Sequence, residues 1–200
     1  MTQPSLVIAA ALFAVCVVFR VPLEGQMVTH VLLLLPALAV AGWLAGRAIA
    51  SRWPGLMSSD WNAVGATGLL TALFAGAFWM LPRSLDWSLS EPLGDVAKFI
   101  SLPLLVGIPL ALSWRRAPFL VRGFLKANAI SMALTLAWIY SYAPVRLCIS
   151  YLTGQQEQLG VGFLWVAGVI SVLWIAPLLG VPTPSWSARR APSLAAGHQP

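Results

Sequence analysis

The chain has 200 residues, of which 59% are hydrophobic and only 9% are charged, and its mean hydropathy is +0.83. A typical globular domain has about 45–50% apolar and about 25% charged residues, so a soluble fold could not cover its surface with this composition. These values exclude a disordered chain, a coiled coil and nearly every soluble enzyme. Ten Trp and fifteen Pro fit a helical membrane protein, in which Trp lies at the interfaces and Pro is tolerated within spans. We therefore expect an all-α, polytopic transmembrane helix bundle.

Six apolar segments each approach the ~20 residues that a helix needs to cross a bilayer. In chain order they cover about 5–23, 27–49, 61–81, 96–113, 124–144 and 160–180. The first has the shortest apolar run, since Arg20 follows Phe19, and a cleaved signal peptide is the alternative there, although no basic residue precedes the run. Residues 1–180 are expected to form one bundle domain, and the Pro-, Ser- and Arg-containing residues 181–200 a disordered cytoplasmic tail.

The distribution of Lys and Arg predicts the orientation of the bundle, because cytoplasmic loops carry an excess of these residues. One face receives both termini and eight basic residues, namely Arg47, Arg52, Arg115, Arg116, Arg122, Lys126, Arg189 and Arg190. The other face receives four, namely Arg20, Arg83, Lys98 and Arg146. Five of the six acidic residues, Glu24, Asp86, Glu91, Asp95 and Glu157, also lie on this second face. We expect both termini in the cytoplasm and a mildly acidic outer face.

Small residues occur at helix-packing spacing within two of the predicted spans. In the third span Gly65, Gly68, Ala72 and Gly76 lie three to four residues apart, and the second span has a stricter pattern. Gly42 and Gly46 form a GxxxG pattern, which lets two helices approach closely. The pattern is compatible with a specific dimer face and with packing inside a six-helix bundle, and packing is the interpretation that we favour.

The chain contains none of the common catalytic signatures, such as GxSxG, a Walker loop, HExxH or CxxC. Its six acidic residues are all predicted in loops or at helix ends, whereas an ion-coupled pump normally places carboxylates within its spans. The basic residues lie between apolar runs and form no stripe, so we expect no nucleic-acid partner. These observations favour a non-enzymatic membrane protein. A small-solute permease is the alternative, with Thr67, Thr71, Asn128, Ser131 and Thr135 as candidate lumen residues.

Sulfur and imidazole side chains are predicted near the outer face of the bundle. Met27 and His30 lie one turn apart on one helix, and Met80 ends the third span. The two cysteines, Cys16 and Cys148, are placed near the same level. Soft sulfur ligands with an imidazole suit Cu(I), so His30, Met27 and Met80 form a candidate metal site, although Met and Cys also fill gaps in ordinary cores.

Three segments resemble the CtaG-like family of cytochrome c oxidase assembly factors. The stretch 26–33 reads QMVTHVLL, where the family has His-Met-x-x-His before a Leu run. The stretch 79–89 reads WMLPRSLDWSL, in register with a family pattern Trp-His-x-Pro-x-x-Tyr-Asp-x-x-Leu. Near the end, QEQLG at 156–160 leads into LWVAG at 164–168, as Asp-Gln-x-x-x-Gly leads into Met-Trp-x-x-Gly in the family. The resemblance spans about residues 20–175.

The resemblance implies an integral assembly factor or accessory subunit for a respiratory membrane complex of the haem-copper oxidase type. It also implies a bacterial inner (plasma) membrane location, membrane oxidoreductase subunits as partners and a role in copper handling. Most of the family's histidines are replaced, because Gln26 and Met80 stand at histidine positions and Lys98 stands near a third. Between the two spans that flank 82–97 we further expect a short interfacial helix carrying Asp86 and Trp87, which docks on a partner or on the bundle itself. The alternative, which the residues favour slightly, is a loop at the level of the lipid headgroups that Trp87 anchors.

Overall fold

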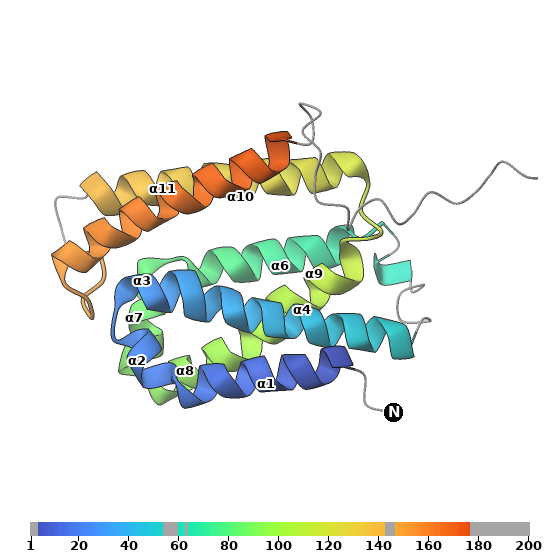
Figure 1. Cartoon of the computed structure of the whole chain (residues 1–200), viewed down its shortest axis with the longest axis horizontal. Helices are drawn as coiled ribbons and strands as arrows, with labels where there is room; N and C mark the ends of the chain where they lie inside the picture. The colour runs from blue at the N-terminus through green and yellow to red at the C-terminus, as the bar shows by residue number, and fades with distance from the viewer. Residues whose placement is uncertain (1–3, 54–59, 63, 143–146, 177–200) are drawn as a thin grey trace, which may run out of the picture.

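The computed structural model describes residues 4–53, 60–62, 64–142 and 147–176, and within these ranges every regular element is a helix. The long helices run side by side between two ends of the molecule (Figure 1). In chain order the elements are α1 (Pro4–Val18), α2 (Arg20–Glu24), α3 (Met27–Thr29), the π-helical turn η1 (His30–Leu34), α4 (Leu35–Arg52), the 3₁₀ turn η2 (Asp60–Asn62), α6 (Ala66–Trp79), α7 (Pro82–Ser90), α8 (Pro92–Ser101), the π-helical segment η3 (Leu102–Gly107), α9 (Ile108–Ser113), α10 (Phe119–Tyr142) and α11 (Thr153–Ile175). The predicted all-α class is therefore confirmed for this part of the chain.

Four continuous helical runs are long and apolar enough to cross a membrane: Met27–Arg52, Pro92–Ser113, Phe119–Tyr142 and Thr153–Ile175. A fifth crossing results if α6 and α7 are counted as one span, which is bent by 70° at residues 80–81. Helix α1 is apolar but has 15 residues, fewer than the ~20 that a perpendicular span needs. The chain is thus a multi-pass membrane protein with four or five clear candidate spans, and the sixth predicted span stays a prediction.

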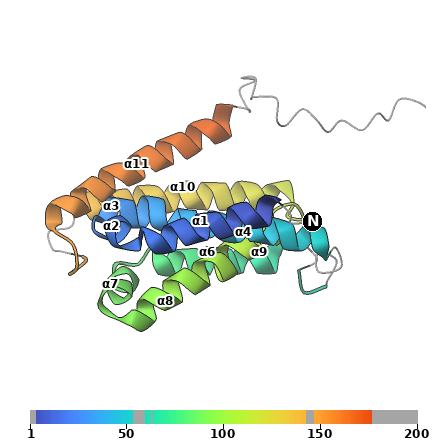
Figure 2. The same ribbon diagram turned by 60° about the horizontal axis from the view of Figure 1, so that its bottom comes forward.

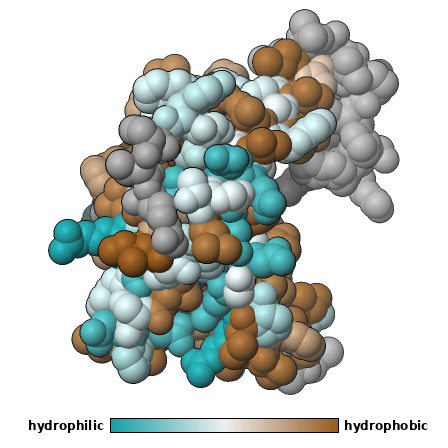
Figure 3. Space-filling model, turned by 90° about the vertical axis from the view of Figure 1, so that its left-hand side faces the viewer, coloured by the Kyte–Doolittle hydropathy of each residue, from teal (hydrophilic) through white to brown (hydrophobic). Residues whose placement is uncertain are grey.

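The charged residues collect at the two ends of the helices. At one end α1 begins, α4 and α9 end, α10 begins and α11 ends (Figure 1). We call this the basic end, because Arg47, Arg52, Arg115, Arg116, Arg122 and Lys126 belong to these helix ends. The opposite end holds α2, α3, α7 and the start of α11 (Figure 1), and we call it the acidic end, after Glu24, Asp86, Glu91, Asp95 and Glu157. Figure 3 faces the acidic end and shows hydrophilic side chains interspersed with hydrophobic ones.

Both π-helical segments accompany prolines inside a spanning run. Pro36 follows η1 by two residues, and Pro103 lies within η3. A proline has no N–H for the carbonyl four residues earlier, and its ring clashes with that carbonyl. Local widening to a π turn relieves the clash and lets later N–H groups pair, which matters in a membrane because no water can replace a lost bond. His30 begins the first of these π turns.

The GxxxG pair mediates packing within the chain. Gly42 and Gly46 are buried in α4, and a Cβ at Gly42 would overlap the backbone of Pro103 in η3. A Cβ at Gly46 would come within 2.8 Å of Ala111 Cβ and 3.0 Å of Ile108 Cα. Gly107 in η3 forms the other side of this contact, because a Cβ there would overlap the Ala39 carbonyl and the Gly42 backbone in α4. The interpretation as internal packing is confirmed for α4 against the η3–α9 run.

The last two helices form a hairpin on one flank of the bundle. Helices α10 and α11 contact each other along much of their length, and α11 also touches α3 at the acidic end. Figure 2 shows α11 leaning away from the other helices toward its C-terminal end. The predicted tail 181–200, with Arg189 and Arg190, lies outside the described residues, as does Arg146.

The close approach of α4 to η3 makes a prediction about Gly42. Gly42→Ala should lower the free energy of unfolding by about 1–3 kcal/mol, because overpacking a tight interface forces backbone shifts. Gly76→Ala is the matched control, since a Cβ at Gly76 in α6 meets nothing within 4 Å. The control should be neutral or slightly stabilising, because Ala is a better helix former than Gly. Thermal unfolding of the purified protein in mild detergent measures both. Equal melting temperatures for the two variants would contradict the close contact.

Candidate functional site

A buried ionic cluster at the acidic end joins four separate parts of the chain. We call it the Lys98 cluster and define it as Arg20, Glu24, His30, Asp95, Lys98 and Tyr151. Arg20 and Glu24 come from α2, His30 begins η1, and Asp95 and Lys98 lie one turn apart in α8. Tyr151 comes from the segment that precedes α11. The cluster therefore ties the first helices to the middle and to the end of the sequence.

Lys98 is the centre of the cluster and its side chain is completely buried. Its Nζ lies 2.6 Å from Glu24 Oε1 and 3.1 Å from Asp95 Oδ1. Asp95 in turn accepts a hydrogen bond from Arg20 Nη1 to its Oδ2, at 2.8 Å. Two cations and two carboxylates thus neutralise one another. A buried ammonium is tolerated only when it is paired in this way, because its removal from water costs several kcal/mol.

The hydrogen bonds of His30 define its tautomer. Lys98 Nζ lies 3.4 Å from His30 Nε2, and an ammonium only donates, so Nε2 is the acceptor. The proton is therefore on Nδ1, which lies 2.8 Å from the Tyr151 hydroxyl and donates to it. The Tyr151 hydroxyl donates in turn to the Glu24 carbonyl oxygen at 2.7 Å. Hydrogen bonds thus run from Lys98 to His30, from His30 to Tyr151 and from Tyr151 to the Glu24 carbonyl, and each donor in this series has an acceptor.

The protonation state of Tyr151 is consistent with this chain. Burial raises the pKa of the Tyr151 phenol above its usual range, and the negative charges of Glu24 and Asp86 raise it further. The hydroxyl therefore keeps its proton and remains the donor to the Glu24 carbonyl.

A second set of contacts fastens α7 to the segment before α11. The Asp86 carboxylate accepts hydrogen bonds from the backbone N–H groups of Ile149 and Ser150, at 2.9 and 3.0 Å. Trp87 stacks on Trp79 with the ring centroids 6.2 Å apart. The predicted short helix within 82–97 is thus confirmed as α7, and its Asp86 and Trp87 both contact other parts of this chain.

Cys148 is buried beside these contacts. Its thiol lies 3.7 Å from the Pro82 carbonyl oxygen, to which it donates. Burial and the nearby Asp86 charge raise the pKa of the Cys148 thiol to about 12. Since the thiolate is the reactive form of cysteine, Cys148 is an inert packing residue at neutral pH.

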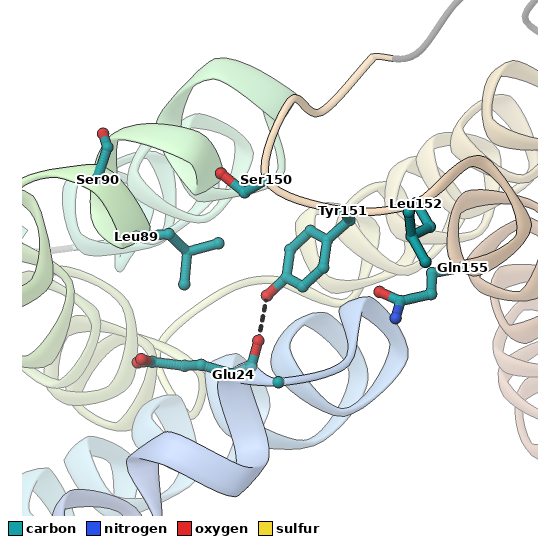
Figure 4. A pocket seen from close by; sticks show the side chains of 8 residues that line it. Glu24, Leu89, Ser90, Ser150, Tyr151, Leu152 and Gln155 are labelled. Atoms are coloured by element: carbon teal, nitrogen blue, oxygen red, sulfur yellow. Dashed lines mark hydrogen bonds between the residues drawn. The ribbon is translucent and has the colours of Figure 1, made fainter.

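A cavity of about 330 Å³ adjoins the Lys98 cluster. Figure 4 shows Leu89 and Tyr151 on its walls, with Ser90 and Ser150 on one side and Gln155 on the other. Glu24 also lines the cavity, but Lys98 already neutralises its carboxylate. Gln155 Oε1 accepts a weak hydrogen bond from the Met27 N–H at 3.4 Å. The lining combines hydroxyl, amide and leucine side chains and has no acid–base pair free to act on a substrate.

The predicted metal ligands lie in the same region of the fold. Met27 and His30 are completely buried, and Met80 is half-buried and packs against the same core as Met27. Both ring nitrogens of His30 already have partners, so Cu(I) at Nε2 would have to displace the Lys98 ammonium. The described part of the chain contains no group of three His, Cys, Asp or Glu side chains arranged for a metal ion. His30 as placed offers no free nitrogen, and the copper site stays a prediction.

Sequence reasoning did not foresee the partnership of Lys98 with Glu24 and Asp95, nor the role of Tyr151. The signal was a lysine within an apolar segment, since an ionisable residue at such a position normally has a partner. The residues that pair with it are 3, 68 and 74 positions away, so their proximity follows only from the fold.

No protein-family model matches the chain, and neither the curated proteins nor the solved structures contain a significant match to it. The resemblance to the CtaG-like family is therefore carried by the quoted sequence segments alone.

Lys98 should be the most sensitive position of the acidic end. Lys98→Met removes the ammonium while roughly keeping the volume, and leaves Glu24 and Asp95 without their buried counter-charge. Breaking a buried pair in this way costs about 3–5 kcal/mol. Arg20→Gln is the matched control, because the Arg20 side chain is 52% exposed and exposed ion pairs contribute about 0–1 kcal/mol. Detergent-solubilised unfolding curves compare the two. A Lys98→Met protein as stable as Arg20→Gln would contradict the central role of Lys98.

Proposed function

We propose that the protein is a non-enzymatic assembly factor or accessory subunit of a respiratory membrane complex of the haem-copper oxidase type. The quoted resemblance supplies the class of complex. The observation that supports a binding role is the exposed face of α10, a candidate spanning helix that packs within the chain mainly on α11. The charged groups of the ionic cluster form ion pairs with one another, which is consistent with a structural role.

The exposure of α10 distinguishes it from the other spanning helices. In the most apolar 18-residue stretch of α10 only 6% of the residues are buried within the protein, compared with 44% for the corresponding stretch of Met27–Arg52. Its outward face carries large side chains at helical spacing, including Phe124, Leu134, Trp138 and Tyr142. Lipid covers such a face in an isolated protein, and a second membrane protein covers it in a complex. Helix α10 packs mainly on α11, and these large side chains remain exposed beside that contact, which favours a role in binding another subunit.

The polar residues considered for a permease lumen do not support that alternative. Thr71 donates to the Thr67 carbonyl and Thr135 to the Ser131 carbonyl, each at 2.9 Å. These are bonds within a single helix, as Ser and Thr commonly make. Ser131 and Thr135 also line a groove of about 440 Å³ whose walls come from α10 and α11 alone. An enclosed path for a solute would require walls from further helices.

For the topology we propose six crossings with both termini in the cytoplasm of a bacterial cell, the basic end facing inward. Helices α1 and α2 together would form the first crossing. Alkaline phosphatase, which is active only outside the cytoplasm, should be active when fused at Asp86 and inactive when fused at the C-terminus. The reverse pattern would overturn the orientation. Modification of an N-terminal tag from outside the intact cell would show that α1 does not cross.

The proposed binding role is tested by purification from native membranes. A tagged protein extracted in mild detergent should copurify with haem-copper oxidase subunits, identified by mass spectrometry after a native gel. Phe124→Ala with Leu134→Ala should reduce this recovery at least tenfold, because it removes apolar area from the exposed face of α10. The matched control is Phe74→Ala with Ile100→Ala, which removes similarly exposed side chains from α6 and α8. Absence of oxidase subunits from the wild-type sample would refute the proposal, and equal losses for both variants would refute the role of α10.

A further inference from the structure

The basic end contains a cavity lined by two cationic side chains and three aromatic ones. Its volume is about 160 Å³, and its lining residues are Trp114, Phe119, Arg122, Gly123, Lys126 and Trp174. Trp114 follows α9, the next four lie near the start of α10, and Trp174 lies near the end of α11. The cavity therefore lies at the basic end, between the end of α9, the start of α10 and the end of α11.

The two cations of this cavity have no acidic partner in the part of the chain that the structure describes. Arg122 and Lys126 are four residues apart in α10 and so share one face of the helix. Neither forms an ion pair among the described residues, where the salt bridges are those of Arg20 and Lys98 at the opposite end. The Arg122 Nε–H is buried and has no hydrogen-bond acceptor within the described ranges. A buried donor without an acceptor is costly, and here it belongs to a charged group.

Other cations at this end differ from this pair. Arg116 donates to the Asn62 carbonyl at 2.8 Å, and the Arg47 guanidinium lies over the Trp43 ring at 4.8 Å. Arg115 is exposed to the surroundings. Arg122 and Lys126 are thus the cations that line a cavity and also lack a described partner within the protein.

The chemistry of the cavity specifies an oxyanion ligand. A guanidinium presents its N–H groups in a planar fork that matches two oxygens of a phosphate, and a neighbouring ammonium adds a point charge. The tryptophans suit the level of the lipid headgroups, where aromatic rings with a polar edge accumulate. Phe119 lines the cavity, and its side chain and that of its chain neighbour Leu120 are 74% and 80% exposed, which provides an apolar surface for an acyl chain at the start of α10.

From this combination we infer that the cavity binds the phosphate group of an anionic phospholipid. The phosphate oxygens accept from Arg122, including its unpartnered Nε–H, and Lys126 supplies the second positive charge. The glycerol and acyl portions extend along Phe119 and Leu120 toward the bilayer. A free phosphate would meet the same cations but would gain nothing from this apolar surface, so the lipid is the favoured source. The inference concerns a lipid site on this chain and is independent of the proposed oxidase partner.

Gly123 provides a way to close the cavity without changing any charge. It lines the cavity between the two cations, and a Cβ at this position meets nothing within 4 Å. A leucine at this position would therefore fill space that the headgroup needs. Gly154→Leu is the matched control, because Gly154 is equally open but lies in the first turn of α11 at the acidic end.

The experiment uses the full-length protein, purified in a mild detergent and mixed with phosphatidylglycerol or phosphatidylcholine. Native mass spectrometry then measures the fraction of protein that retains one lipid. We expect one phosphatidylglycerol per chain, at least tenfold preference over phosphatidylcholine, and no displacement by millimolar inorganic phosphate. Arg122→Gln and Gly123→Leu should each reduce retention at least tenfold. Arg115→Gln, which removes one charge outside the cavity, and Gly154→Leu should change it less than twofold. The monodispersity and melting temperature of each variant show whether it remains folded.

Three results would overturn the inference. Equal losses for Arg122→Gln and Arg115→Gln would mean that lipid is attracted only by the net charge of this end. Equal retention of phosphatidylcholine would mean that the apolar surface alone holds lipid. Displacement by inorganic phosphate would mean that the cavity is a site for a free anion. If Arg122→Gln is not folded, the folded Gly123→Leu variant decides the question alone.

Discussion

The burial of one ammonium group organises the acidic end of this protein. Lys98 is completely buried within 3.1 Å of two carboxylates, and these carboxylates come from α2 and from α8 itself. Because an unpaired buried charge is so unfavourable, α8 can pack in this position only when α2 is in place. His30 and Tyr151 extend the same constraint to η1 and to the start of α11. The pairing of Lys98 thus sets the relative positions of four segments. The hydrophobic effect alone would not do so, because it is non-directional and would allow these helices to shift along one another.

The two ends of the bundle treat their charges differently. At the acidic end, cations and carboxylates neutralise one another, and Asp86 is saturated by backbone N–H groups. At the basic end, Arg122 and Lys126 line a cavity without a described counter-charge. The helices are fixed to one another at the acidic end by these ion pairs. At the basic end, anionic lipid headgroups are the groups of the membrane that can neutralise the cations. This asymmetry is consistent with an inward-facing basic end, where anionic lipids attract basic residues.

The sequence predicted the helical class and the approximate positions of the helices, because long apolar runs bounded by charges leave few alternatives in a bilayer. The run predicted at 27–49 corresponds to Met27–Arg52, and that at 96–113 to Pro92–Ser113. The short α1 agrees with the short apolar run before Arg20, whereas the bend between α6 and α7 was not evident, because hydropathy does not report the direction of a helix. The candidate site was predicted less well. His30 was singled out from its residue type, but its hydrogen bonds to Lys98 and Tyr151, 68 and 121 positions away, were not foreseen. Pairings at such separations depend on helix packing that no local pattern encodes.

The distribution of satisfied and unsatisfied groups also bears on where the function of this protein lies. Within the bundle the tight contacts are made by small residues such as Gly42 and Gly107 against backbone, which leaves no room for a substrate between these helices. At the acidic end, Lys98, His30, Tyr151 and Asp86 form hydrogen bonds or ion pairs within the chain. These interactions stabilise the packing of the helices. What remains uncommitted is on the outside, namely the exposed face of α10 and the cations of the basic end. In a bilayer, other spanning helices and lipids are the groups that can reach these exposed surfaces, which is why both proposals place binding there.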